Sequence, residues 1–283
     1  MRWAIAMREV GVHPIRAGHC VHPQRMTIRD GGWRPAVYPA LSMLIVHPVE
    51  GPILFDTGYD PAFFAATAPF PERFYRWLTP VTLAEGSEVA AQLARFGFAA
   101  GDIRHLILSH FHADHIAGAH AFPNAAIHCA KAGLDAACSG GRFAAVRRGV
   151  LRALLPPDIA VRARFFEDAA RVVLPGALRP FDMGADLLGD GSLVAVELPG
   201  HCPGHWGLVV SDAAHGEHFM VADAAWSSDA IRRNMAPPSI TSNFLGSAKR
   251  VEATLARLNA LWRRNPAIRL SPAHCPERAA EAE

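Results

Sequence analysis

Residues 109–115 read Ser109-His110-Phe111-His112-Ala113-Asp114-His115, which places three histidines and an aspartate within six positions. In an extended chain the side chains alternate between two faces, so His110 and His112 point the same way and can reach one metal ion. Asp114 and His115 follow where the chain turns towards a helix, and they can reach a second ion close by. Zinc prefers imidazole and carboxylate donors. The stretch therefore predicts a metal site rather than a histidine-rich surface loop.

Short apolar runs bounded by proline and glycine predict buried strands on both sides of this stretch. They lie at residues 41–46, 52–55, 103–108, 193–198, 206–210 and 218–222. Apolar residues at helical spacing predict helices at 89–96 and 251–262. Strands are followed by a helix in the first part of the chain and again in the second part. This order indicates a layered α/β fold built from two halves.

Three further candidate ligands stand at the ends of predicted strands. His201 follows the run 193–198 at a tight Pro-Gly turn, Asp223 ends the run 218–222, and His274 follows a short apolar run near the C-terminus. Ligands at strand ends on one edge of a sheet sandwich can converge although they are far apart in sequence. Together with residues 110–115 they predict one shared site.

Residues from about 130 to 191 are interpreted as an insertion of helix and loop rather than a second domain. It is expected to hold a helix that turns Phe143 inward and ends at Pro156-Pro157. The aromatic pair Phe165 and Phe166 has two interpretations. The pair packs the insertion onto the rest of the fold, or it lines a substrate pocket as part of a lid.

The composition limits the range of partners. The 283 residues are 51% hydrophobic, with 28 Lys and Arg against 26 Asp and Glu, and this balance gives no support for a nucleic-acid partner. No run approaches the roughly 20 apolar residues of a membrane span, and residues 1–10 lack the apolar core of a secretory signal. Five scattered cysteines predict reduced thiols in the cytoplasm. We expect a cytoplasmic protein that acts on a small molecule, and a homodimer is compatible with this sequence.

The sequence resembles the metallo-β-lactamase superfamily over nearly its whole length. The resemblance rests on the H-x-H-x-D-H pattern of residues 110–115, on Asp56-Thr57-Gly58, on Pro199-Gly200-His201-x-Pro203-Gly204-His205, on Asp223 and on His274. It implies a single domain over residues 1–283, folded as a four-layer αββα sandwich with two divalent metal ions at one edge. Zinc is the expected metal, and the same donors accept iron, manganese or cobalt.

Carried over by position, the resemblance gives each candidate residue a role. It assigns His110, His112 and His201 to the first metal, Asp114, His115 and His274 to the second, and Asp223 to a bridge between them. Asp56 would orient the ligands from outside the metal shell. His205 matches a position that is usually structural.

Two cysteines stand directly after candidate ligands. Cys202 follows His201 and Cys275 follows His274. Adjacent side chains diverge in a strand or turn, so both cysteines are predicted to be small buried fillers rather than metal ligands. A true β-lactamase with a cysteine ligand would need a thiol where Asp223 stands.

The implied reaction is attack on a lactone or ester carbonyl by a hydroxide that bridges the two metals. The pattern is most similar to the acyl-homoserine lactonase branch, which acts in quorum quenching. Asp114 and Asp223 are the candidate catalytic residues, with Asp114 passing a proton to the leaving group. Members of that branch carry a tyrosine three residues after the bridging aspartate, where this chain has Trp226 as a candidate substrate contact.

Other activities remain open at this stage. An organophosphate triesterase or arylesterase of the methyl parathion hydrolase type shares the same metal shell. A glyoxalase-II-like thioesterase shares it too, although no basic cluster for glutathione follows Asp223. The alternative that is not an enzyme is a metal-binding sensor that kept the fold, and the complete ligand set argues against it.

Overall fold

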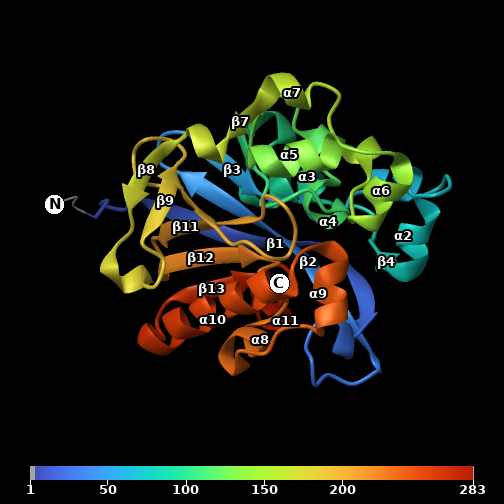
Figure 1. The fold of residues 1–283 in the computed structure, drawn as a ribbon. Helices are drawn as coiled ribbons and strands as arrows, with labels where there is room; N and C mark the ends of the chain where they lie inside the picture. The colour runs from blue at the N-terminus through green and yellow to red at the C-terminus, as the bar shows by residue number, and fades with distance from the viewer. Residues whose placement is uncertain (1–3, 283) are drawn as a thin grey trace.

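The computed structural model describes residues 4–282, which form two mixed β-sheets with helices on both outer sides (Figure 1). The first sheet holds β1 (Glu9–Pro23), β2 (Pro35–His47), β3 (Gly51–Phe55), β4 (Val81–Thr82), β5 (His105–Ile107), β6 (Ala126–Cys129) and β7 (Ala163–Phe165). The second holds β8 (Ala170–Val173), β9 (Met183–Asp186), β10 (Val194–Glu197), β11 (Trp206–Asp212), β12 (Gly216–Ala222) and β13 (Arg269–Pro272). The start of β1 pairs with the end of β11 and joins the two sheets.

Seven helices follow strands of the first sheet and pack on its side. They are α1 (Ala62–Ala66), α2 (Arg73–Leu78), α3 (Val89–Gln92), α4 (Ala113–Ile116), α5 (Lys131–Cys138), α6 (Arg142–Arg147) and α7 (Ile159–Arg162). The C-terminal helices are α8 (Ser228–Arg233), α9 (Ser239–Leu245), α10 (Ala248–Arg264) and α11 (Pro276–Ala279). Of these, α8 and α10 pack on the second sheet, which completes the expected αββα order. None of the helices within residues 4–282 has the length and apolar character to cross a membrane.

Alternation along the strands explains why the layers stack. On β2 and β3, Leu44 and Leu54 face the helices of the first side, whereas Ile45 and Ile53 face the second sheet. This is the period of two that a strand buried on both faces requires. All four side chains are fully buried, and each such burial stabilises the fold by about 1.5–3 kcal/mol.

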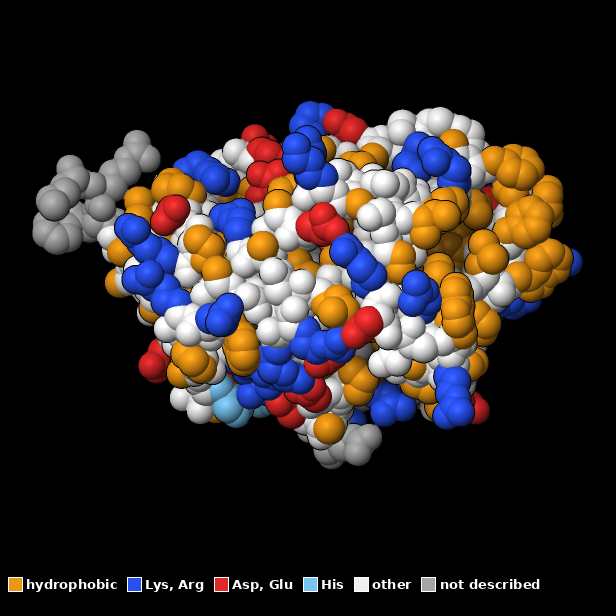
Figure 2. Space-filling model, turned by 60° about the horizontal axis from the view of Figure 1, so that its bottom comes forward, with side chains coloured by type: hydrophobic (Ala, Val, Ile, Leu, Met, Phe, Trp, Pro, Cys, Tyr) orange, Lys and Arg blue, Asp and Glu red, His pale blue; other side chains and the backbone are white. Residues whose placement is uncertain are grey.

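The predicted strands are confirmed, but two predicted helices are shorter than expected. Residues 89–96 form one α-turn, α3, followed by a 3-10 helix that ends at Gly97, which has a left-handed φ of 80°. The helix after residue 142 ends at Arg147, because Gly149 takes a φ of 76° that an α-helix does not allow. The inward orientation predicted for Phe143 is wrong, since this side chain is 63% exposed and packs against Phe70. Hydrophobic side chains gather on the surface at the end of the molecule that carries α2 and α6 (Figure 2).

Much of the stretch between residues 130 and 191 belongs to the sandwich itself. Strand β7 extends the first sheet beside β6, and β8 and β9 extend the second sheet beside β10. The helices α5, α6 and α7 connect these strands and add to the first core. Short strands of three or four residues carry too little periodicity to be separated from loop in the sequence.

Candidate metal centre

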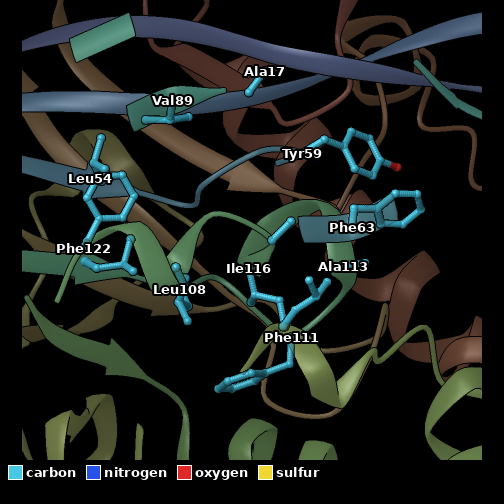
Figure 3. Close-up of a cluster of buried hydrophobic side chains, with 14 of the residues drawn as sticks. Ala17, Leu54, Tyr59, Phe63, Val89, Leu108, Phe111, Ala113, Ile116 and Phe122 are labelled. Carbon is cyan, nitrogen blue, oxygen red and sulfur yellow. The ribbon is translucent and has the colours of Figure 1, made fainter. Parts of the chain in front are cut away.

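The loop after β5 and the helix α4 bring one set of candidate ligands to the edge of the first sheet. Its polar members are His110, His112, Asp114 and His115, and all of them are buried. The apolar residues of the same stretch, Phe111, Ala113 and Ile116, point into the first hydrophobic core, as Figure 3 shows. The apolar residues thus anchor the loop while the polar residues face the site. The predicted turn into a helix is confirmed, since α4 begins at Ala113.

A first cluster consists of three histidines. Nε2 of His201 lies 2.9 Å from Nδ1 of His112. The ring of His110 lies 4.5 Å from that of His112 and 4.9 Å from that of His201. One donor atom of each of these residues, together with Sγ of Cys202, lies within 4.8 Å of all the others. This group fits a metal ion, since histidine and cysteine are common zinc ligands.

A second cluster combines a carboxylate with two histidines. Oδ2 of Asp114 lies 3.2 Å from Nε2 of His274 and 3.8 Å from Nε2 of His115. The donor atoms of the three residues lie within 4.8 Å of one another. This group also fits a metal ion, and its donors are harder than those of the first cluster.

Asp223 stands between the two clusters and offers one oxygen to each. Its Oδ2 lies 3.2 Å from Nε2 of His201, while its Oδ1 lies 3.2 Å from Nε2 of His274 and 3.4 Å from Nε2 of His115. The residue follows β12, where Ala222 has a φ of 45°. Non-glycine residues rarely take this conformation, and such strain concentrates at functional sites.

Unpaired buried nitrogens mark the cavity between the clusters. Nε2 of His110, His115 and His274 has no hydrogen-bond partner of suitable geometry within residues 4–282. Leaving one buried donor or acceptor unpaired costs about 1–3 kcal/mol, so such nitrogens in both clusters indicate a site for a ligand. The donors present therefore fit divalent metal ions.

Charge separates the two clusters. Burial lowers the pKa of His110 and His201 well below the usual value, so both rings are neutral at pH 7. Burial acts in the same direction on His115 and His274, but nearby aspartates outweigh it and raise their pKa well above the usual value. Burial would raise the pKa of Asp223, yet His274 and His115 lower it and keep the carboxylate ionised. The second cluster thus has a strongly negative potential, which a divalent cation would neutralise.

Residues outside the clusters hold the ligands in place. Oδ2 of Asp56 lies 2.8 Å from Nδ1 of His115, and its carboxylate also accepts hydrogen bonds from the backbone N–H and hydroxyl of Ser109. The Ser109 hydroxyl lies 2.9 Å from Nδ1 of His110, so one aspartate orients a ligand of each cluster. Asp56 has a φ of 60°. Nδ1 of His274 donates to the carbonyl oxygen of Pro39 at 2.7 Å.

His205 lies beside the clusters and has a structural role. Its Nδ1 donates to the carbonyl oxygen of Leu198, and its Nε2 accepts from the backbone N–H of Asp223. Both nitrogens are therefore used, which agrees with the structural position predicted for it. It also fixes the backbone at Asp223.

Two residues that position the ligands were missed by the sequence reasoning. Ser109 stands directly before His110, so its position in the sequence was enough to suggest a contact with a ligand. Gly149 gave no such signal, because it lies 37 positions beyond the ring that it contacts. A Cβ on Gly149 would lie 2.7 Å from Cδ2 of His112. Only glycine leaves room for that ring.

A small cleft opens beside the clusters. Its lining includes Thr27, Asp223, Trp226 and residues of α9. Trp226 is half-buried, its ring lies 4.5 Å from that of His274, and it meets Tyr38 edge to face at 5.2 Å. The structure therefore places Trp226 at the cleft as well as in an aromatic contact.

Phe165 and Phe166 do not line this cleft. Phe166 is 1% exposed and packs against Trp206 between the sheets, while Phe165 packs on the first core with Lys131 over its ring. These contacts favour the packing interpretation over that of substrate contacts. The cause is that β7 belongs to the first sheet, so these residues form core rather than a lid.

The two cysteines beside candidate ligands differ. Cys275 is fully buried and accepts hydrogen bonds from the N–H of Ser228, as the filler prediction requires. The predicted divergence of Cys202 is wrong, because its Sγ belongs to the first cluster of donors. Divergence holds for strands, whereas residues 201–204 form a bend and a turn.

Comparisons with known proteins agree with this arrangement. The profile of the metallo-beta-lactamase superfamily matches residues 36–216. The probable metallo-hydrolase Rv2300c of Mycobacterium tuberculosis is 27% identical over 187 residues, which is 61% of this chain and 53% of that protein. The chain thus spans about half the length of this relative. The N-acyl homoserine lactonase AttM of Azorhizobium caulinodans is 27% identical over 272 residues, which is 92% of each chain.

Solved structures share the fold. An N-acyl homoserine lactone hydrolase, with the product N-hexanoyl-L-homoserine bound at its catalytic metal centre, superposes with a TM-score of 0.74 at 19% identity and covers 98% of each chain. AidC, a dizinc quorum-quenching lactonase, superposes with a TM-score of 0.62 at 18% identity and covers 97% of this chain and 90% of its own. At such identities the likeness concerns the fold alone.

Proposed function

This chain belongs to the metallo-beta-lactamase superfamily, and from that premise we propose that it is a metal-dependent hydrolase that opens lactones, with N-acyl homoserine lactones as the substrate class. The observation that carries the proposal is the pair of buried donor clusters that share Asp223. The relatives named N-acyl homoserine lactonase favour this substrate class.

Two divalent ions, zinc by preference, fit the donors. His110, His112 and His201 would hold one ion, Asp114, His115 and His274 the other, and Asp223 both. A pair of such ions lowers the pKa of a water molecule towards neutrality and polarises the carbonyl oxygen of a substrate. The dizinc relative AidC supports the choice of zinc.

The chain's own residues would supply orientation and proton transfer. Asp223 contacts histidines of both clusters and fixes their spacing. Asp56 holds His115 through Nδ1 and leaves Nε2 directed into the site. Asp114, whose Oδ2 lies 3.2 Å from Nε2 of His274, would accept a proton and pass it to the alkoxide that leaves when the ring opens.

The cleft supports a neutral, partly apolar substrate. Met26, Trp226, Leu245 and Leu255 contribute apolar walls, and Thr27 contributes a hydroxyl. Among residues 4–282, no Lys or Arg lines the cleft. A glutathione thioester carries two carboxylates and would be poorly neutralised there, which disfavours the thioesterase alternative. An N-acyl lactone has no charge, and its acyl chain matches the apolar walls.

A second candidate activity is hydrolysis of aryl esters or phosphotriesters. It is favoured by the aromatic contact of Trp226 with Tyr38 beside the cleft, since an aryl leaving group stacks well on such rings. The indole of Trp226 offers an N–H but no hydroxyl. The sensor alternative is disfavoured, because no cluster lacks a donor. Location in the cytoplasm, the single-domain organisation and a homodimer stay predictions.

The proposal is tested by metal analysis of the purified protein together with turnover of a small panel. The panel holds an N-acyl homoserine lactone, a simple γ-lactone, an aryl ester, a phosphotriester and a glutathione thioester. We expect about two ions per chain, lactone opening, and loss of that activity in His112→Ala but not in Phe165→Ala. Activity on the aryl ester or phosphotriester alone would contradict the lactone substrate class and support the second candidate activity. A protein without metal or turnover would refute the proposal.

A further inference from the structure

The tripeptide His-Cys-Pro occurs twice, and each time its histidine is a candidate ligand. The copies lie at residues 201–203 and 274–276. Since the local sequences are the same, only their surroundings can give the two cysteines different roles. They form a natural pair in which one serves as the control for the other.

Cys275 is held away from the donors. Its Sγ lies 3.3 Å from the backbone N of Ser228 and 3.2 Å from the Ser228 hydroxyl, and the residue is fully buried. It stands where the chain enters α11, with Pro276 at the first turn of that helix. Cys275 therefore packs α8 against the end of β13, and its sulfur is already paired.

Cys202 has different surroundings. It is half-buried, and within residues 4–282 no hydrogen bond engages its sulfur. Its Sγ lies within 4.8 Å of donor atoms of His110, His112 and His201. Independently, Nε2 of His110 is fully buried and has no hydrogen-bond partner. A thiol and an unpaired imidazole nitrogen thus converge on the same point.

The turn that presents Cys202 is rigid. Gly204 has a φ of 68°, and a Cβ there would lie 2.3 Å from the backbone N of Gly133. Gly200 has a φ of 140°, and a Cβ there would lie 2.4 Å from the backbone N of Val251. Both glycines let the turn press against neighbouring backbone, and Pro203 fixes the dihedral between them. The side chains of His201 and Cys202 are thereby held on one side.

We propose that Sγ of Cys202 is a further side-chain donor of the histidine cluster, so that this half of the centre binds its ion through three imidazole nitrogens and one sulfur in addition to the shared Asp223. The inference rests on the proposed metal centre. On binding, a sulfur–metal bond forms, the S–H bond breaks and the proton leaves to solvent, with no change of oxidation state. A soft sulfur donor favours zinc or cobalt over manganese or magnesium in this half.

The test is a titration of the metal-free protein with Co²⁺ under anaerobic conditions, followed by absorption. Bound Co²⁺ gives visible d–d bands with any ligand set, whereas a near-ultraviolet thiolate-to-cobalt charge-transfer band requires sulfur. We expect the charge-transfer band in the wild type and in Cys275→Ser, and its loss in Cys202→Ser and Cys202→Ala. In the Cys202 variants, affinity for the ion in this half should fall at least roughly 10–100-fold. A loss of this size follows when a residue that only hydrogen-bonds to a metal ligand is removed.

The outcomes separate the two proposals. Visible bands without the charge-transfer band in the wild type would overturn the role of Cys202 and leave the metal centre intact. A charge-transfer band that persists in both Cys202 variants, or that disappears in Cys275→Ser, would also overturn it. A wild-type protein that binds no Co²⁺ would overturn the metal centre and this inference together. The wild-type spectrum needs no variant, so a variant that misfolds does not block the test.

Discussion

The two halves of the metal centre share Asp223 but differ in the pKa values of their histidines. The histidine half, with His110, His112 and His201, consists of neutral rings whose pKa burial lowers. The carboxylate half, with Asp114, His115 and His274, has histidines whose pKa the aspartates raise although burial opposes it. The first half is ready to bind a cation at neutral pH. The second attracts a cation more strongly, but it must release protons first.

Their supports differ as well. The carboxylate half is held by hydrogen bonds that His115 donates to Asp56 and His274 donates to the carbonyl oxygen of Pro39. In the histidine half, the ring of His112 is held by close packing against Gly149. Substitutions that change charge should therefore affect the carboxylate half most, and substitutions that change side-chain volume should affect the histidine half most. The following predictions use this difference.

The largest effect is expected from Asp223→Asn, which keeps the volume of the side chain but removes the charge that both halves share. Each 1.36 kcal/mol of lost transition-state stabilisation costs tenfold in rate, and we expect a fall in kcat/KM on the order of 1000-fold. Asp212→Asn is the control, because Asp212 is equally buried but caps a turn at the end of β11. Equal losses in both variants would show a structural effect only.

Asp56→Asn should act mainly on the carboxylate half, because Asp56 contacts His115 directly. It reaches His110 only through the Ser109 hydroxyl. The amide cannot stabilise a positively polarised His115 as the carboxylate does, so affinity for the second ion should fall roughly 10–100-fold. Calorimetric titration with Zn²⁺ resolves the two binding events. Asp60→Asn, a buried aspartate four positions away, should leave both events unchanged. An equal fall in both affinities would contradict the larger role of Asp56 in the carboxylate half.

The pH dependence of metal binding should also differ between the halves. The pKa values of His115 and His274 are raised, so binding to their half displaces protons, and its affinity should rise about tenfold per pH unit for each proton displaced. The histidine half should be nearly independent of pH above about 6.5, since its rings are already neutral. Titrations between pH 6 and about 8.5 compare the two slopes. Equal pH dependence of metal affinity in the two halves would contradict the electrostatic difference between them.

The same shifts predict a stability profile for the metal-free protein. A raised pKa in the folded state means that folding takes up protons, so this stabilisation is fully present below the usual histidine pKa of about 6.5. It should be lost as the pH rises through the folded-state values of His115 and His274. Thermal unfolding of the metal-free protein at increasing pH measures it. A rise in the unfolding temperature as the pH increases would contradict the raised pKa values of His115 and His274.

The smallest effect is expected from Gly149→Ala. The added methyl group would press on the ring of His112, and the φ of 76° at this position is strained for alanine, at a cost of about 1–3 kcal/mol. The free energy of unfolding should fall by that amount, and binding should weaken in the histidine half only. Gly176→Ala is the control, because a Cβ there meets nothing within 4 Å.

The sequence predicts the donors better than their supports. All seven donors are recognisable, because four lie in one local pattern and the other three follow apolar strands that end at the same edge. Asp56 follows β3 and is recognisable for the same reason. Gly149 is not, since its contact with His112 depends on how the chain returns from α6.

Errors of orientation have a common origin. Helical periodicity places Phe143 inward, the aromatic pair suggests a lid for Phe166, and the divergence of adjacent side chains places Cys202 away from the ligands. Each of these residues lies where regular structure is short or absent. Phe143 lies in the first turn of a helix of six residues, Phe166 follows a strand of three, and Cys202 lies in a bend. Over so few residues the direction of a side chain is set by tertiary packing, which a single sequence does not contain.

The central claim, that two ions sit in two halves that share Asp223, is tested most directly by anomalous scattering at the zinc edge from crystals of the zinc-loaded protein. The account predicts two peaks, one among His110, His112 and His201 and the other among Asp114, His115 and His274, with Asp223 in contact with both. A single peak, or a second peak away from these residues in fully loaded crystals, would contradict it.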